Sequence, residues 1–240
     1  MNYNLIDTHC HINFFKNAGD IALECERRKV YTIYVTTLPS QFNETFKYVE
    51  NLKYIYSSLG FHCLESEYNL LDEKKIFSQH IDNTKFIGEI GLDFSKRAIK
   101  SKKEQIELFR FILESIQGKD KILNLHSTSS EDEVLEILIK YDIKKAIFHW
   151  YSGKIGTLNK IIKLGYYFSV NISMCKSKKG RNIISKIPKD KILVETDAPF
   201  IKDVLPYSND DVYIFLSTIW DINIIDVKKI ISSNFKRLIF

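Results

Sequence analysis

The sequence predicts a single (β/α)8 barrel that spans residues 1–240. Short apolar runs rich in Val, Ile and Phe alternate with longer amphipathic stretches, a pattern typical of strand–helix units around a parallel sheet. Eight such runs can be counted, and a chain of 240 residues suits a barrel of eight strands and eight helices. No GxGxxG turn follows the first apolar run, which disfavours an open dinucleotide-binding sheet.

The eight apolar runs are the predicted strands of this barrel. They extend over Leu5–His11, Val30–Thr37, Ile55–His62, Phe86–Asp93, Ile122–His126, Ala146–Trp150, Tyr166–Asn171 and Ile192–Asp197. Intervening segments such as Lys102–Gln117 and Glu131–Tyr141 place apolar residues three and four positions apart, which predicts helices with one buried face. The tail from Asp210 to Phe240 predicts two more helices, and no Pro-, Gly- or Ser-rich linker marks a second domain.

Composition narrows the class of protein. Hydrophobic residues make up 45% of the chain, which is enough for a large core. We expect a cytoplasmic protein, because no basic leader or apolar run of about 20 residues occurs. The four cysteines contain no CxxC pair, which argues against a structural zinc site and favours reduced thiols. A net charge of +5 is compatible with an anionic substrate.

Five of the six histidines stand at or near the C-terminal end of a predicted strand. They are His9, His11, His62, His126 and His149, and His80 alone falls in a predicted helix. In this type of barrel the C-terminal strand ends meet at one face, where active sites are built. We therefore expect these imidazoles to lie close together.

The spacing of these residues predicts a metal centre. Side chains alternate along a strand, so His9 and His11 point to the same side and can share one ion. Glu89 and Asp93 likewise share a face of the fourth strand, where neighbouring glycines allow close approach. Asp197, at the end of the eighth strand, is suited to be a ligand or a base.

Five strings in this order resemble the motifs of the TatD family of metal-dependent deoxyribonucleases, within the amidohydrolase superfamily. They are IDTHCHI at 6–12, GEIGLDF at 88–94, NLHS at 124–127, FHWYSG at 148–153 and ETDAP at 195–199. The similarity covers nearly the whole chain. It implies that His9 and His11 bind one divalent ion, that His126 and His149 bind the other, and that Glu89 bridges them.

The resemblance also implies a mechanism. Two ions of Mg, Mn or Zn would sit about 3.5–4 Å apart and activate a shared water for attack on a phosphodiester bond. Asp197 completes the first site and accepts the proton of that water, so that Asp197 and Glu89 are the catalytic carboxylates. Glu195 is expected to orient ligands rather than to bind an ion. DNA, as single strands or 3′ ends, is the expected substrate.

Two stretches depart from the family pattern. Residues 200–211 read FIKDVLPYSNDD where the family usually has an Arg-Gly-Lys-x-Asn-Glu-Pro stretch, which puts substrate contacts on this side in doubt. GFHC at 60–63 has Cys63 in place of the Pro of the family's GxHP motif. It keeps the His, which implies that His62 contacts a substrate phosphate. TTLPS at 36–40 and GLDFS at 91–95 resemble the TatD-like nuclease of Qat anti-phage systems, which would imply partner proteins of a defence complex.

Basic residues follow two predicted strands and suggest a path for nucleic acid. Lys176, Lys178 and Lys179 come after the seventh strand, and a second run from Lys96 to Lys103 comes after the fourth. Both lie on connections that reach the predicted metal face, so we expect them to bind substrate phosphates. The aromatic side chains of Phe14, Phe94 and Trp150 could stack on bases.

Two other functions are consistent with the same motifs. A small-molecule amidohydrolase or lactonase uses the same barrel, although many of these enzymes bridge their ions with a carboxylated Lys where this chain has Glu89. A binding subunit whose metal centre only stabilises a complex is the second alternative. A cleavage assay on single-stranded DNA, a phosphotriester and an N-acyl amino acid separates the three.

Overall fold

The eight strands of the protein form one parallel sheet that rolls into a nearly closed barrel, in a computed structural model that describes residues 3–65 and 68–240. Each strand pairs with the next one in the chain, in the order β1 to β8. Their bounds are β1 Ile6–Cys10, β2 Tyr31–Val35, β3 Ile55–Leu59, β4 Phe86–Gly91, β5 Ile122–His126, β6 Ala146–His149, β7 Tyr167–Val170 and β8 Ile192–Val194. The predicted fold class is confirmed.

Hydrogen bonds at the mouth of the barrel join its two edge strands. The Asp197 N–H donates to the His9 carbonyl at 2.9 Å, and the His11 N–H donates to the Ala198 carbonyl at 2.8 Å. Deeper in the seam, the Thr8 hydroxyl donates to the Val194 carbonyl at 3.2 Å. The ends of β1 and β8 are therefore held together at the point where both carry predicted site residues.

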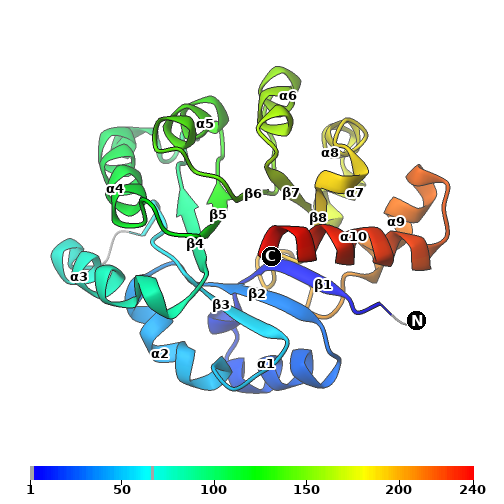
Figure 1. The fold of residues 1–240 in the computed structure, drawn as a ribbon, viewed down its shortest axis with the longest axis horizontal. Helices are drawn as coiled ribbons and strands as arrows, with labels where there is room; N and C mark the ends of the chain where they lie inside the picture. The colour runs from blue at the N-terminus through cyan, green and yellow to red at the C-terminus, as the bar shows by residue number, and fades with distance from the viewer. Residues whose placement is uncertain (1–2, 66–67) are drawn as a thin grey trace.

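Helices surround the strands, as Figure 1 shows. They are α1 Ala18–Arg27, α2 Pro39–Val49, α3 Leu70–His80, α4 Lys102–Ser115, α5 Glu131–Lys140, α6 Ile155–Lys163, α7 Ile172–Lys176, α8 Lys178–Ile184, α9 Asp210–Trp220 and α10 Ile224–Ile239, with four short 3-10 turns. In α4 the buried side chains recur three and four positions apart, which turns one stripe of the helix towards the sheet. The predicted pair of helices after Asp210 is confirmed as α9 and α10.

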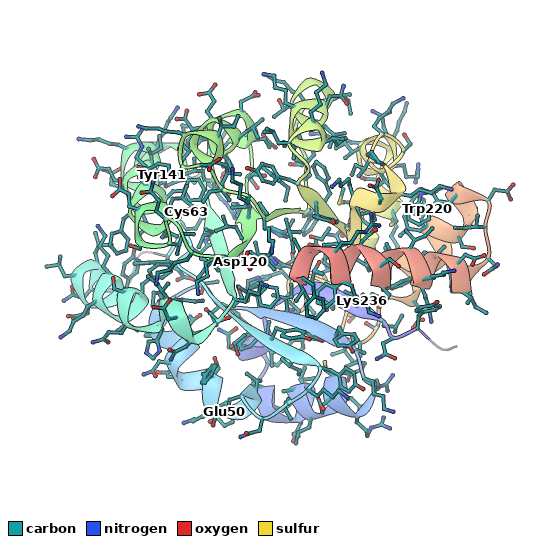
Figure 2. All side chains as sticks on the ribbon, in the orientation of Figure 1. Glu50, Cys63, Asp120, Tyr141, Trp220 and Lys236 are labelled. Atoms are coloured by element: carbon teal, nitrogen blue, oxygen red, sulfur yellow. The ribbon has the colours of Figure 1, made fainter. Side chains whose placement is uncertain are left out.

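The last helix closes one end of the molecule. In Figure 1, α10 crosses in front of the barrel beside β1 and β8. Its buried Asn234 donates to the carbonyls of Lys189, in the 3-10 turn before β8, and of Ile192, the first residue of β8. The strand ends that carry the site residues are therefore at the opposite end. Charged side chains such as Lys236 and Asp120 stand on the outer surface in Figure 2.

The strands are shorter than predicted, because their last residues leave the ladder. The predicted runs end at His62, Asp93, Trp150, Asn171 and Asp197, whereas the paired segments stop one to three residues earlier. Trp150 and Asp197 have φ values of 40° and 52°, a left-handed conformation that turns the chain out of the sheet. These terminal residues therefore lie beyond the paired strands, at the mouth of the barrel.

Within the described residues, no helix is both long enough and apolar enough to cross a membrane.

Candidate metal centre

The first group of candidate ligands lies at the ends of β1, β4 and β8. The Nε2 atoms of His9 and His11 are 3.1 Å apart. Glu89 Oε2 lies 3.3 Å from His11 Nε2 and 3.8 Å from His9 Nε2. Asp197 Oδ1 lies 3.7 Å from each of these two nitrogens. Ligand atoms bound at about 2.1 Å to one ion lie roughly 3.0–3.4 Å apart, so the four atoms can surround a divalent cation after small adjustments.

The second group lies around the other oxygen of Glu89. Glu89 Oε1 is 3.0 Å from His126 Nδ1, 3.2 Å from His149 Nε2 and 3.4 Å from His62 Nε2. The two oxygens of one buried carboxylate therefore face two different sets of imidazoles. This is the arrangement expected of a carboxylate that bridges two ions.

The hydrogen-bond partner of the outer ring nitrogen decides which nitrogen of His9 and His126 is free for an ion. His9 Nδ1 is 2.7 Å from Asn124 Oδ1, and the amide of Asn124 donates to the Thr8 carbonyl at 2.6 Å. Because the amide nitrogen is thus occupied, Asn124 Oδ1 must accept the proton of His9 Nδ1, and Nε2 keeps its lone pair. His126 Nε2 faces Asp93 Oδ2 at 3.1 Å, which leaves Nδ1 free in the same way.

The Glu195 carboxylate lies behind the ring of His149. Its Oε1 is 3.5 Å from His149 Nδ1, and Nε2 on the other side of that ring faces Glu89 at 3.2 Å. Glu195 also accepts from the hydroxyl of Ser169 and, at 2.8 Å, from the amide of Asn171. It is fully buried, and these donors stabilise its charge.

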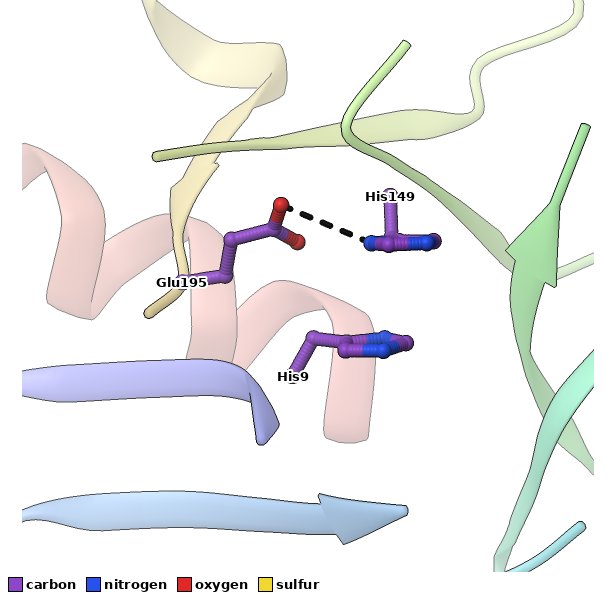
Figure 3. Close-up of side chains that lie close together, drawn as sticks. All are labelled: His9, His149 and Glu195. Atoms are coloured by element: carbon purple, nitrogen blue, oxygen red, sulfur yellow. Dashed lines mark ion pairs between the residues drawn. The ribbon is translucent and has the colours of Figure 1, made fainter. Parts of the chain in front are cut away.

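Figure 3 shows that Glu195 and the rings of His9 and His149 lie together. The two rings are stacked, with centroids 3.8 Å apart and planes within 9°. Imidazole lone pairs lie in the ring plane, so those of two stacked rings run parallel and do not meet at one ion. The two rings therefore do not converge on one ion, and each belongs to one of the two groups described above.

His62 differs from the other imidazoles. Its Nδ1 accepts the N–H of Leu64 at 3.1 Å, so a neutral His62 carries its proton on Nε2. That nitrogen points towards Glu89 at the barrel mouth. His62 is therefore suited to donate a hydrogen bond, whereas the rings backed by acceptors are suited to bind an ion.

Burial and neighbouring charges shift the pKa values across the centre. Burial lowers the pKa of His9 well below its ordinary value, and it lowers that of His11 as well. Burial also opposes the charged form of His149, but Glu195 and Glu89 raise its pKa well above the ordinary value. Burial raises the pKa of Asp197 to about 8. For Glu89 the surrounding imidazoles overcome burial and hold its pKa well below the usual range.

A cleft of about 540 Å³ opens above the two groups. Its floor includes Glu89 and Asp197, and its walls carry the aromatic rings of Phe14, Trp150 and Phe200. Arg97 also lines it, and its guanidinium lies 3.9 Å from the carboxylate of Asp93. The cleft thus combines a carboxylate–imidazole floor with aromatic walls and one cation.

The structure brings together all six predicted ligands, which are His9, His11, Glu89, His126, His149 and Asp197. The three predicted lysines are exposed, and none of them lines the cleft. Lys179 lies beside a neighbouring hollow that also contains Phe94, and Lys176 lines a hollow behind Glu195. Their contact with substrate stays a prediction.

Two positioning residues were not predicted. Asn124 stands two residues before His126 on a buried strand, and the alternation along a strand could have placed both side chains inside the barrel. Buried Asp7 accepts from the N–H of His9 and, at 2.9 Å, from the N–H of Thr196. It ties the two chain segments that carry the first group of ligands.

Comparison with known proteins agrees with this centre. The sequence profile of TatD-related DNases matches residues 6–239. The metal-dependent hydrolase YjjV of Escherichia coli is 29% identical, over 81% of this chain and 79% of its own length. The human deoxyribonuclease TATDN3 is 24% identical, over 81% of this chain and 78% of its own length.

The fold has a solved counterpart as well. The crystal structure of E. coli YjjV, described as a TatD homologue, superimposes with a TM-score of 0.87 and 24% sequence identity. The match covers 98% of this chain and 97% of that one, so the whole barrel is shared. Because the family profile spans almost the full sequence and the barrel mouth holds the imidazole and carboxylate groups, this chain belongs to the family of TatD-related DNases.

Proposed function

We propose that this protein hydrolyses phosphodiester bonds of DNA with the help of two divalent ions, of Mg, Mn or Zn. The observation that carries the proposal is the position of Glu89, whose two oxygens face two separate sets of imidazoles. His9, His11 and Asp197 would hold the first ion, and His126 and His149 would hold the second. Oxygen and imidazole donors of this kind suit these metals.

The donor set fits such ions for a physical reason. His9 Nε2 and His11 Nε2 are buried 3.1 Å apart, and neither of their carboxylate neighbours is closer than 3.3 Å. His9 keeps its proton on Nδ1, so its Nε2 lone pair faces His11 Nε2; a cation would take both nitrogens as ligands once the proton of His11 is on Nδ1, a buried atom without a hydrogen-bond partner among the described residues. When bound, two divalent ions lower the pKa of an attacking water and offset the charge of the phosphodiester.

The protein's own groups then position the reactants. Asp197 borders the floor of the cleft and is placed to accept the proton of the attacking water. His62, with its proton on Nε2, is placed to donate to a phosphate oxygen. The water oxygen bonds to phosphorus as the bond to the leaving oxygen breaks, and that oxygen takes up a proton. The products are one phosphate monoester and one hydroxyl.

The test is a cleavage assay with purified protein. Metal-free protein is reloaded with Mg, Mn or Zn and incubated with single-stranded DNA, a phosphotriester and an N-acyl amino acid. We expect cleavage of the DNA alone. Turnover of a small substrate without cleavage of DNA would replace this proposal with an amidohydrolase or lactonase activity.

We also propose, from the sequence resemblance to the Qat nuclease, that the activity serves anti-phage defence together with partner proteins. A plaque assay compares a host that carries the wild-type gene and its neighbours with one that carries Glu89→Ala. Protection is expected only with the wild type, and equal protection by both would contradict the role of hydrolysis in defence.

A further inference from the structure

Two further hollows share lining residues with the cleft. One, of about 650 Å³, lies among the starts of α5, α6 and α8 and meets the cleft at Ser152, which lines both. The other, of about 580 Å³, lies between α3 and α4 and meets the cleft at Leu64 and Arg97. A polymeric substrate held at the cleft extends beyond it, and these two hollows adjoin the cleft directly.

The carboxylates of the first hollow are engaged by neighbours. Glu133 lies 3.7 Å from the ammonium of Lys102, and Asp132 accepts the hydroxyl of Thr157 at 2.7 Å. Glu131 is partly buried, and burial raises its pKa although Lys179 acts in the opposite direction. The three carboxylates of this hollow are therefore matched by its three ammonium groups, of Lys102, Lys154 and Lys179.

Two ammonium groups of the same hollow are free. Lys154 and Lys179 are both exposed, and within residues 3–65 and 68–240 no carboxylate oxygen lies within 4.0 Å of either. Beside them the half-buried ring of Phe94 offers an aromatic surface, with Lys102 4.5 Å from its centroid. Free cations next to an aromatic ring are the features that hold a single-stranded polynucleotide.

The second hollow has an excess of free carboxylates. Glu65 and Glu104 line it, and in the described part of the chain neither has a Lys or Arg nitrogen within 4.0 Å. Of its two cations, Arg97 faces Asp93, and Lys74, 4.6 Å from the ring centroid of Phe111, is outnumbered by the two free carboxylates. Free carboxylates repel a phosphate backbone.

We infer that the substrate strand leaves the metal centre over the hollow of Lys154, Lys179 and Phe94, and not over the hollow of Glu65 and Glu104. This inference rests on the proposed function and adds to it the class and course of the substrate. The substrate is a single strand several nucleotides long, bound on one side of the scissile bond by its backbone. It also singles out Lys179 among the three lysines that the sequence indicated.

The test compares a short and a long substrate in two matched variants. Lys154→Ser/Lys179→Ser removes both free cations of the hollow. Lys160→Ser/Lys186→Ser removes two exposed lysines in or just after the same helices, outside the hollow. Hydrolysis of d(TpT) and of (dT)12 is measured for each, and binding of labelled (dT)12 is followed in Ca²⁺ at several salt concentrations.

The inference predicts a loss confined to the long substrate. The hollow variant should lose roughly fivefold to tenfold in kcat/KM on (dT)12 and stay within about twofold on d(TpT). Its logarithmic salt slope should fall by about 1.4, because each neutralised phosphate of a single strand contributes roughly 0.7. The control variant should match the wild type in all three measurements.

Two results would overturn the inference, and a third concerns only the proposed function. Equal losses in both variants would mean that net charge, and not this hollow, attracts the strand. An unchanged (dT)12 value and salt slope in the hollow variant would place the strand elsewhere. If the wild type cleaves neither substrate, the nuclease proposal fails, while the binding measurement still decides whether the hollow holds a strand.

Discussion

At the scale of single residues, the centre depends on the atom behind each imidazole. Asn124 and Asp93 accept from the outer nitrogens of His9 and His126, and the Glu195 carboxylate lies 3.5 Å from that of His149, so the inner nitrogens can bind an ion. The N–H of Leu64 reverses this arrangement for His62. The proposed metal ligands and the proposed substrate contact thus differ in what lies behind them, although all are histidines at strand ends.

Glu89→Ala should be the most damaging single change. Glu89 faces both groups of imidazoles, whereas each His belongs to only one group. We expect the metal content of the purified variant to fall towards zero, measured by elemental analysis. Glu65→Ala, which also lies at the cleft, is the control and should keep its ions. Two ions still bound to Glu89→Ala would exclude the bridging role.

His62→Ala should separate substrate binding from metal binding. The proton on Nε2 makes this side chain a donor, so its loss should leave two ions in place. Removal of a charge-assisted hydrogen bond costs about 1.5–3 kcal/mol, which predicts a drop of roughly tenfold to a hundredfold in kcat/KM. Elemental analysis and steady-state kinetics on the same preparation measure both effects. Loss of one ion would make His62 a ligand.

The residues of the centre could be predicted from the sequence, whereas the contacts that orient them could not. His9 and His11 alternate on one strand, and this local pattern is visible in any chain that forms a strand there. The role of Asn124 depends on a partner across the barrel, and no spacing within β5 indicates which ring it meets. Contacts between distant strands, such as Asp7 with Thr196, need the closed barrel before they can be inferred.

At the scale of elements, the strand ends are built for close approach. Gly91 has a φ of 135°, and a Cβ placed on it would lie 2.0 Å from the His126 carbonyl oxygen. Gly60 is equally crowded, with the Thr36 carbonyl oxygen 1.6 Å from the same position. These glycines bring the ends of β3, β4 and β5 close enough for Glu89 to reach the imidazoles.

Gly91→Ala should therefore destabilise the protein and displace His126. A backbone clash combined with a left-handed conformation costs on the order of 2–4 kcal/mol in the free energy of unfolding. Gly156→Ala is the matched control, because no atom lies within 4 Å of its Cβ position in α6. The control should gain about 0.5–1 kcal/mol. Urea denaturation measures both, and equal stability of the two variants would contradict the crowding argument.

The number and type of elements were predictable, but the exact strand ends were not. Apolar runs indicate where a strand lies, because burial on both faces selects Val, Ile and Phe. They do not indicate where pairing stops, since residues such as His62 and Trp150 leave the sheet to line the cleft. The contacts that these residues make at the barrel mouth outweigh their local preference for a longer strand.

At the scale of the whole molecule, the metal centre and the charge state of the protein are linked. In the metal-free protein Glu195 and Glu89 raise the pKa of His149, and Asp93 and Glu89 raise that of His126, although burial opposes both shifts. Each ring therefore keeps its second proton to a higher pH than an ordinary imidazole, and this proton must leave before the inner nitrogen binds an ion.

Metal binding should consequently release protons, and its affinity should weaken as the pH falls. Groups with raised pKa values stay protonated to a higher pH, so the competition from protons is strongest below neutrality and fades above it. Titration calorimetry at pH 7 in two buffers with different ionisation enthalpies measures the release. A binding enthalpy that is the same in both buffers would mean that the imidazoles are already neutral.

The whole barrel serves to bring distant segments to one carboxylate. The ligands come from β1, β4, β5 and β6 and from the turn after β8, and the hydrogen bonds between β1 and β8 close the ring that holds them. α10 supports the opposite end through Asn234. Family membership follows from the whole sequence, whereas the proposed hydrolysis depends on these few residues.

The measurement that tests the central claim most directly joins metal content to DNA cleavage. Metal-free protein is reloaded with increasing Mn²⁺, and for each sample the bound ions and the rate of (dT)12 hydrolysis are determined. We predict that the rate reaches its maximum only as occupancy approaches two ions per chain, because Glu89 faces two sets of imidazoles. A full rate at one ion per chain, or two bound ions without any cleavage, would contradict a two-ion phosphodiesterase.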